Sequence, residues 1–114
     1  MKFKALIKPD QGRGKGMGFP TANFDLDMEI EDGIYLGKAQ ELPALIFIGS
    51  NVTFGEDRRH GEAYILDYDK DLYGQEIEVE ILKKLRENKK FGSQEELVDQ
   101  MKQDERQARE FFVL

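Results

Sequence analysis

The sequence contains no cysteine and only one histidine, His60. Without cysteine the chain can form neither disulfides nor metal sites built from thiolates. A single histidine also excludes zinc or iron sites that need several imidazole ligands. Any bound metal must therefore be a hard cation held by oxygen atoms, such as magnesium, manganese or calcium.

Long apolar runs and an excess of basic residues are also missing. No apolar run approaches the roughly 20 residues that a membrane-spanning helix requires, and residues 1–4 lack the apolar region of a signal peptide. The 23 acidic residues outnumber the 17 lysines and arginines, which gives a net charge of −6. Because this charge repels nucleic acids and anionic membranes, we expect neither as a partner. From the missing apolar segments we expect a cytoplasmic location.

The length and composition fit one domain. The chain has 114 residues, and domains usually contain about 100–150. Hydrophobic residues make up 39% of the sequence and aromatic residues 11%, which is enough apolar area to build a core. We find no internal repeat, low-complexity tract or linker, so we expect residues 1–114 to form a single domain.

Most of the chain, as far as about residue 85, has the pattern of short strands. Alternating or continuous apolar residues bounded by turn residues occur at residues 2–8, 33–37, 44–48, 63–68 and 75–83. The continuous apolar run at 44–48 predicts a strand that is buried on both faces. The turn residues between the last two strands favour a hairpin between them. His60 precedes these two strands, and we expect it to lie in a loop.

The C-terminal part has helical periodicity. Ser93 and Glu96 have the spacing of a capping box, in which the serine caps the helix and the glutamate reaches back to the backbone. The apolar residues that follow fall on one helical stripe, namely Leu97, Val98, Met101, Ala108 and either Phe111 or Phe112. Short strands followed by one helix predict a small antiparallel barrel whose side or end the helix covers.

Residues 12–23 combine groups that suit a phosphate and a hard metal ion. Glycine occupies every second position from Gly12 to Gly18, and glycines let backbone amides approach phosphate oxygens. Arg13 and Lys15 add positive charge, while Thr21 and Asn23 offer side-chain oxygens for magnesium. The segment matches neither a Walker loop nor a Rossmann fingerprint. It predicts a nucleotide-binding loop, with a flexible hairpin tip as the alternative.

Part of this segment, Gly18-Phe-Pro-Thr-Ala-Asn23, resembles the signature of the riboflavin kinase family. That module occurs alone or as the C-terminal half of bacterial bifunctional FAD synthetases. Further matches in order and spacing are Ile48-Gly49, Thr53-Phe54-Gly55, Glu62 to Asp67, Asp71 to Gly74, Leu85-Arg86, Lys90-Phe91 and Glu96-Leu97 through Asp104. The resemblance covers nearly the whole chain. It implies a mainly β fold, a six-stranded antiparallel Greek-key barrel with a C-terminal α-helix.

The resemblance also implies a reaction, in which the γ-phosphate of ATP is transferred to the ribityl 5′-hydroxyl of riboflavin to give FMN. Glu62 would be the catalytic base, Thr21 and Asn23 would hold Mg²⁺, and Arg86 and Phe91 would lie near the flavin. The implied ATP-binding residues are Gly12, Arg13, Gly14, Lys15, Gly16, Gly18, Phe19, Pro20, Thr21 and Asn23. We expect riboflavin, FMN, ATP and ADP as partners of a monomer.

Some positions depart from the family pattern and leave two alternatives open. Glycines that the family has near Ala5 and Pro9 are replaced here, and the segment from Lys38 to Pro43 is short. These changes motivate a non-catalytic flavin- or nucleotide-binding module that keeps the barrel. A reductase-like flavin-binding barrel is a further alternative, in which Thr21 and Asn23 would have no purpose. Without the resemblance, Glu62 alone would be interpreted as an exposed carboxylate at the end of a strand.

Overall fold

The computed structural model describes residues 1–9, 18–50 and 58–114, which form six strands and one helix. The strands are β1 (Lys2–Lys8), β2 (Ala22–Phe24), β3 (Gly33–Ala39), β4 (Leu42–Gly49), β5 (His60–Ile65) and β6 (Glu76–Arg86), and the helix is α2 (Gln94–Phe112). Within these residues no helix has both the length and the apolar composition needed to cross a membrane. The strand-then-helix order predicted from periodicity is confirmed.

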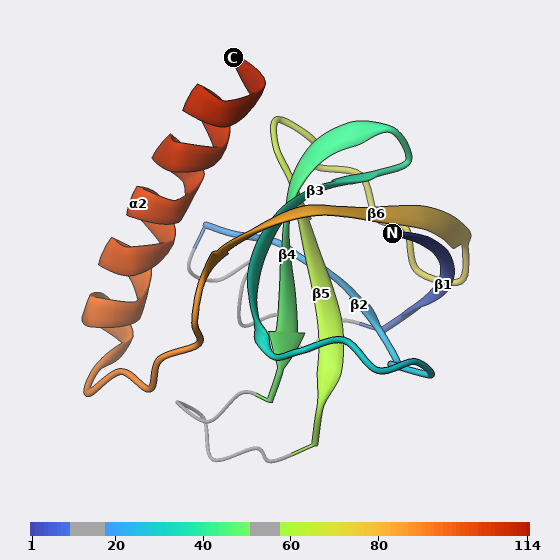
Figure 1. Ribbon diagram of the computed structural model, residues 1–114, viewed down its shortest axis with the longest axis horizontal. Helices are drawn as coiled ribbons and strands as arrows, with labels where there is room; N and C mark the ends of the chain where they lie inside the picture. The colour runs from blue at the N-terminus through green and yellow to red at the C-terminus, as the bar shows by residue number, and fades with distance from the viewer. Residues whose placement is uncertain (10–17, 51–57) are drawn as a thin grey trace.

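The six strands close into an antiparallel barrel in the order β1-β2-β5-β4-β3-β6 (Figure 1). Strands β3, β4 and β5 follow one another as neighbours, and β6 then returns to lie beside β3. Three consecutive strands with a fourth returning beside the first define a Greek key. The predicted six-stranded Greek-key barrel is therefore confirmed.

The predicted hairpin between the last two strands is wrong. Strand β5 pairs with β2 and β4, whereas β6 pairs with β1 and β3. The chain between them turns at Asp67, whose φ is 57°, and again near Gly74, whose φ is 83°. Turn residues are present as predicted, but they serve a crossover from one side of the barrel to the other. Strand β5 also begins at His60 and ends at Ile65, earlier than the predicted range of 63–68.

The barrel interior is filled by the side chains that alternate along the strands. In β4, Ala44, Ile46 and Ile48 point into the main core. Leu45, between them, belongs to a second cluster on the outer side of the sheet. The prediction that this strand is buried on both faces is therefore confirmed, because the second face lies under α2 (Figure 1).

A glycine on β5 makes room for the largest fully buried side chain of this core, that of Phe24. Gly61 lies directly opposite Phe24 in the pairing of β5 with β2. A Cβ atom added to Gly61 would lie 2.1 Å from Cε2 of the Phe24 ring. The ring is 1% exposed and cannot swing into solvent. Because Gly61 has no side chain, the Phe24 ring of β2 can pack against the backbone of β5.

The variant Gly61→Ala is expected to lower the free energy of unfolding by about 2 kcal/mol, because overpacking a filled core costs about 1–3 kcal/mol. Urea unfolding followed by circular dichroism measures the change. Gly92→Ala is the matched control, since its added Cβ would come no closer than 3.4 Å to the flexible carboxylate of Glu96. Equal stability of the two variants would show that the Phe24 ring does not need the glycine.

Helix α2 begins at a cap close to the one that the sequence predicts. The backbone N–H of Glu96 donates to the Ser93 hydroxyl oxygen over 3.2 Å. The Glu96 carboxylate accepts from the backbone N–H of Gly92 at 3.1 Å, one residue before the serine that a capping box uses. The contact of the Glu96 N–H satisfies a donor that the first turn of a helix would otherwise leave unpaired.

The buried side of α2 differs in part from the predicted apolar stripe. Ala108 is fully buried, and Phe112 packs against the outer cluster that includes Leu45. Phe111 is not part of this cluster and is 45% exposed. The other fully buried position on the helix is an acid, Asp104. Periodicity could not place this acid in the interface, because its partner lies on a distant strand.

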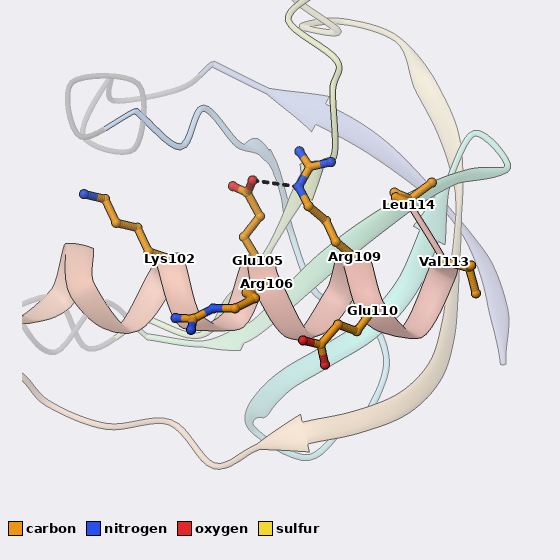
Figure 2. Close-up of a pocket in the computed structure, with 7 residues that line it drawn as sticks. All are labelled: Lys102, Glu105, Arg106, Arg109, Glu110, Val113 and Leu114. Atoms are coloured by element: carbon orange, nitrogen blue, oxygen red, sulfur yellow. Dashed lines mark hydrogen bonds and ion pairs between the residues drawn. The ribbon is translucent and has the colours of Figure 1, made fainter.

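Polar contacts fix the C-terminal half of α2 to the end of β5. The Tyr64 hydroxyl donates to Glu105 at 2.9 Å, and Arg109 donates to both carboxylate oxygens of Asp67. Figure 2 shows the shallow hollow on this part of the helix, with the contact between Glu105 and Arg109 marked. None of the predicted site residues lines this hollow. Of its charged side chains, Glu105 and Arg109 attach the helix to the barrel through Tyr64 and Asp67.

Tyr64 is expected to make stability fall as the solution becomes alkaline. Burial, and then the hydrogen bond to Glu105, raise its pKa to about 12. A phenol in the unfolded chain ionises near pH 10, so between these values the folded state retains a proton that the unfolded state loses. Stability contributed by this proton is present below about pH 10 and is lost as pH rises towards 12.

Urea unfolding at several pH values between about 9 and 11 tests this expectation. The free energy of unfolding should fall more steeply in the wild type than in Tyr64→Phe, which has no phenol to ionise. Tyr73→Phe removes the hydroxyl of an exposed tyrosine and serves as the control. Parallel pH dependences for the wild type and Tyr64→Phe would contradict the assignment.

Candidate active site

The pairing of β2 with β5 brings together predicted site residues that are about 40 positions apart in the sequence. Asn23 on β2 lies directly opposite Glu62 on β5, and Thr21 immediately precedes β2. Along β5, Gly61, Ala63 and Ile65 are buried, so Glu62 belongs to the opposite face of the strand. The strand therefore presents Glu62 on its less buried face.

The hydroxyl of Thr21 holds one oxygen of the Glu62 carboxylate. Thr21 Oγ1 donates to Glu62 Oε1 over 2.9 Å. The amide nitrogen of Asn23 donates to the backbone oxygen of Thr21 at 3.4 Å, which links the two residues of the motif. The Glu62 side chain is 17% exposed. These contacts place a partly shielded carboxylate beside two neutral oxygen-bearing side chains.

Sequence reasoning missed a residue on the other side of the carboxylate. His60 was expected in a loop, but it is the first residue of β5, and its Nε2 atom lies 2.6 Å from Glu62 Oε2. Residues at i and i+2 of a strand share one face. The spacing of His60 and Glu62 would have revealed the contact only if the strand had been known to begin at His60.

The segment before Thr21 is anchored by an aromatic contact. Phe19 is 5% exposed, and its ring meets the Tyr64 ring edge-on at a centroid distance of 5.4 Å. Gly18 has a backbone φ of 88°, a value that residues with a side chain rarely adopt. Pro20 is exposed and adjoins Thr21. Five of the predicted ATP-binding residues, Gly12, Arg13, Gly14, Lys15 and Gly16, lie outside the described residues, as does the Thr53-Phe54-Gly55 motif.

The donor set around Glu62 fits a magnesium ion that is also held by phosphates. Because the Thr21 hydroxyl donates its hydrogen bond to Glu62, the lone pairs of Oγ1 remain available to a cation. No cluster of three or more histidine, cysteine or acidic residues suited to a metal occurs among the described residues. Mg²⁺ commonly binds through one or two protein oxygens and completes its shell with phosphates and water. Thr21 and Asn23 match that kind of site.

The two residues predicted near the flavin lie at the end of β6 and in the segment that follows it. Arg86, the last residue of β6, donates through Nε and Nη2 to the two carboxylate oxygens of Asp104 at 2.8 and 2.7 Å. Phe91 is 8% exposed, and the Lys89 ammonium lies 5.6 Å from its ring centroid. Arg86 thus joins β6 to α2, and Phe91 is buried in the segment between these two elements. Their contact with a flavin stays a prediction.

Comparison with known families decides how this arrangement is classified. The family model described as riboflavin kinase matches residues 1–112. The chain belongs to the riboflavin kinase family. The site that carries the resemblance, with Thr21 and Asn23 opposite Glu62, therefore lies within a module of this family.

Two curated relatives illustrate the range of proteins that contain the module. The bifunctional riboflavin kinase/FMN adenylyltransferase of Escherichia coli is 40% identical over 108 residues, covering 89% of this chain and 34% of the relative. The RNA-binding riboflavin kinase RibR of Bacillus subtilis is 36% identical over 97 residues, covering 80% of this chain and 42% of the relative. The chain thus spans less than half the length of either relative.

Two solved structures resemble the fold. A crystal structure described as a macrolide-efflux protein from Streptococcus pneumoniae has a TM-score of 0.81 at 33% identity, over 95% of this chain and 38% of that chain. Riboflavin kinase from Trypanosoma brucei has a TM-score of 0.67 at 21% identity, over 96% of this chain and 78% of that chain. The second likeness supports the barrel and its terminal helix as the fold of a riboflavin kinase.

Proposed function

We propose that this chain transfers the γ-phosphate of Mg-ATP to the 5′-hydroxyl of riboflavin, with FMN and ADP as products. The observation that carries the proposal is the Glu62 carboxylate, held by Thr21 at 2.9 Å and facing Asn23 across a strand pair. A hydroxyl nucleophile needs one acceptor for its proton, and phosphoryl transfer otherwise depends on positioning and charge neutralisation. The arrangement provides such an acceptor beside two oxygens suited to the metal of a nucleotide.

In the proposed step, Glu62 accepts the proton of the ribityl hydroxyl while that oxygen bonds to the γ-phosphorus. The bond between the γ-phosphorus and the bridging oxygen breaks, and ADP leaves with the electron pair. Thr21 and Asn23 would hold Mg²⁺, which when bound neutralises charge on the phosphates. Thr21 also orients the Glu62 carboxylate through its own hydroxyl proton.

Each oxygen of an ionised carboxylate has more than one lone pair. Glu62 can therefore keep its hydrogen bond to Thr21 and still accept a hydrogen bond from the substrate hydroxyl.

The acidic surface of the chain makes ATP approach against a net charge of −6, so a locally positive segment is required near the phosphates. We assign this role to Arg13 and Lys15, together with the glycines around them.

Direct assay of product tests the proposal. The protein is incubated with riboflavin, MgCl₂ and ATP, and FMN is separated from riboflavin by chromatography, with GTP, CTP and UTP in parallel. We expect FMN with ATP and none when the metal is removed by a chelator. Riboflavin binding by the folded protein without FMN formation would overturn the proposal. It would favour the non-catalytic flavin-binding module instead.

A further inference from the structure

His60 and Thr21 hold the two oxygens of the Glu62 carboxylate from different sides. Thr21 Oγ1 donates to Oε1 at 2.9 Å, and His60 Nε2 lies 2.6 Å from Oε2. The His60 side chain is 18% exposed and that of Glu62 is 17% exposed, so solvent screens this contact only in part. An ionised carboxylate can only accept hydrogen bonds, so the Nε2 atom must carry the proton in this contact.

The imidazole ring is itself fixed by its surroundings. Its Nδ1 atom lies 3.3 Å from the backbone oxygen of Arg58. The ring also packs against that of Phe47, with centroids 5.6 Å apart and a tilt of 56°. Phe47 is opposite Glu62 in the pairing of β4 with β5. The ring that meets the carboxylate therefore packs against a residue of the neighbouring strand β4.

We propose that His60 is a positioning residue, which fixes the orientation of the Glu62 carboxylate for phosphoryl transfer and acts only through Glu62. This inference rests on the proposed function, in which Glu62 accepts the proton of the substrate. A glutamate on a strand can occupy several side-chain rotamers, and two donors on its two oxygens restrict it to one. Each oxygen still has a lone pair for the incoming hydroxyl. Such outer contacts typically change activity by about 10- to 100-fold when they are removed.

Two substitutions separate positioning from simple packing. His60→Phe keeps an aromatic ring against Phe47 but removes the donor, whereas His60→Gln keeps an N–H donor. We expect kcat for FMN formation to fall about 10- to 100-fold in His60→Phe, with KM for ATP within about twofold. His60→Gln should recover kcat to within about fivefold of the wild type, because a donor to a charged group is restored.

Glu105→Gln is the matched control, because it changes another carboxylate that accepts a hydrogen bond from a side chain on the same face of β5. It should leave kcat near the wild-type value. Equal loss in His60→Phe and His60→Gln would assign the effect to packing and overturn the proposal. Unchanged kcat in His60→Phe would overturn it as well.

The double variant His60→Phe/Glu62→Gln tests whether His60 acts through Glu62. Residues that share one interaction have non-additive effects. We therefore expect the double variant to be no slower than Glu62→Gln alone. A further loss as large as that of His60→Phe in the wild-type background would show that His60 acts on the reaction by another route.

A spectroscopic readout keeps this inference separate from the proposed function. The chain has a single histidine, so the ring signals in a long-range ¹H–¹⁵N NMR spectrum belong to His60 without ambiguity. We expect a protonated Nε2 in the wild type and a clear change of its ¹⁵N shift in Glu62→Ala. A ring signal that responds to Glu62→Ala in a protein that forms no FMN would retain the contact while refuting the kinase activity. A signal that does not respond would refute the contact itself.

Discussion

Replacing Glu62 with glutamine is expected to reduce kcat for FMN formation by about 10²- to 10⁴-fold, the range that a general base contributes. The amide is nearly the same shape as the carboxylate and can still accept from Thr21 through its oxygen, but it cannot take the hydroxyl proton. KM for ATP should change little, because Thr21, Asn23 and the glycine segment remain. Steady-state rates of FMN formation at saturating riboflavin and ATP measure the effect.

The control for this substitution is Glu105→Gln on α2. Glu105 also accepts a hydrogen bond from a hydroxyl group, that of Tyr64, at 2.9 Å. This contact, however, attaches the helix to the barrel. Its kcat should stay close to that of the wild type. If Glu62→Gln retained wild-type turnover, another group would have to accept the proton, and Glu62 would lose its proposed role.

The second large effect is expected at the ion pair between Arg86 and Asp104. Asp104 is 3% exposed and receives two hydrogen bonds from the guanidinium, at 2.8 and 2.7 Å, with a third from Gln100 at 3.0 Å. Breaking a buried pair leaves the remaining charge without its partner and typically costs about 3–5 kcal/mol. Because the Arg86 side chain is 22% exposed, we expect Asp104→Asn to lie near the lower limit, about 3 kcal/mol.

Chemical denaturation of Asp104→Asn at neutral pH measures this loss. Asp99→Asn is the control, because Asp99 is an exposed acid on the same helix and surface substitutions usually have small effects. If both variants unfolded at the wild-type denaturant concentration, the pair would not stabilise the junction of β6 with α2.

The same pair bears on the predicted flavin role of Arg86. Its guanidinium gives two of its donors to Asp104 and a third, at 2.9 Å, to the backbone oxygen of Glu87. Such an arginine orders the chain between the end of β6 and the start of α2. Arg86 could contribute to flavin binding either by ordering this segment or by contacting the flavin directly. Titration of Asp104→Asn with riboflavin distinguishes these two routes. Weakened binding in the folded variant would support the indirect route.

The parts of the fold that depend on local periodicity were available from the sequence. Alternation at residues 2–8 and 75–83 marked strands, and Ser93 with Glu96 marked the start of the helix. The three-residue strand β2 was not found, because three residues are too few for a period to appear. The Greek-key topology came from the resemblance to the family and not from the strand pattern.

The sequence by itself determined the chemistry that is available to this protein. The absence of cysteine and the single histidine excluded metal sites built from thiolates or from several imidazoles. The oxygen donors at Thr21 and Asn23 predicted a hard metal and a nucleotide, and the linked motifs pointed to the riboflavin kinase family. Tertiary structure decided which groups meet. Alternation reports which residues share a face of one strand, but it carries no information about the neighbouring strand. The pairing of β2 with β5 placed Asn23 opposite Glu62, and the start of β5 at His60 placed that residue against the second oxygen. The packing of α2 on the barrel placed Asp104 against Arg86.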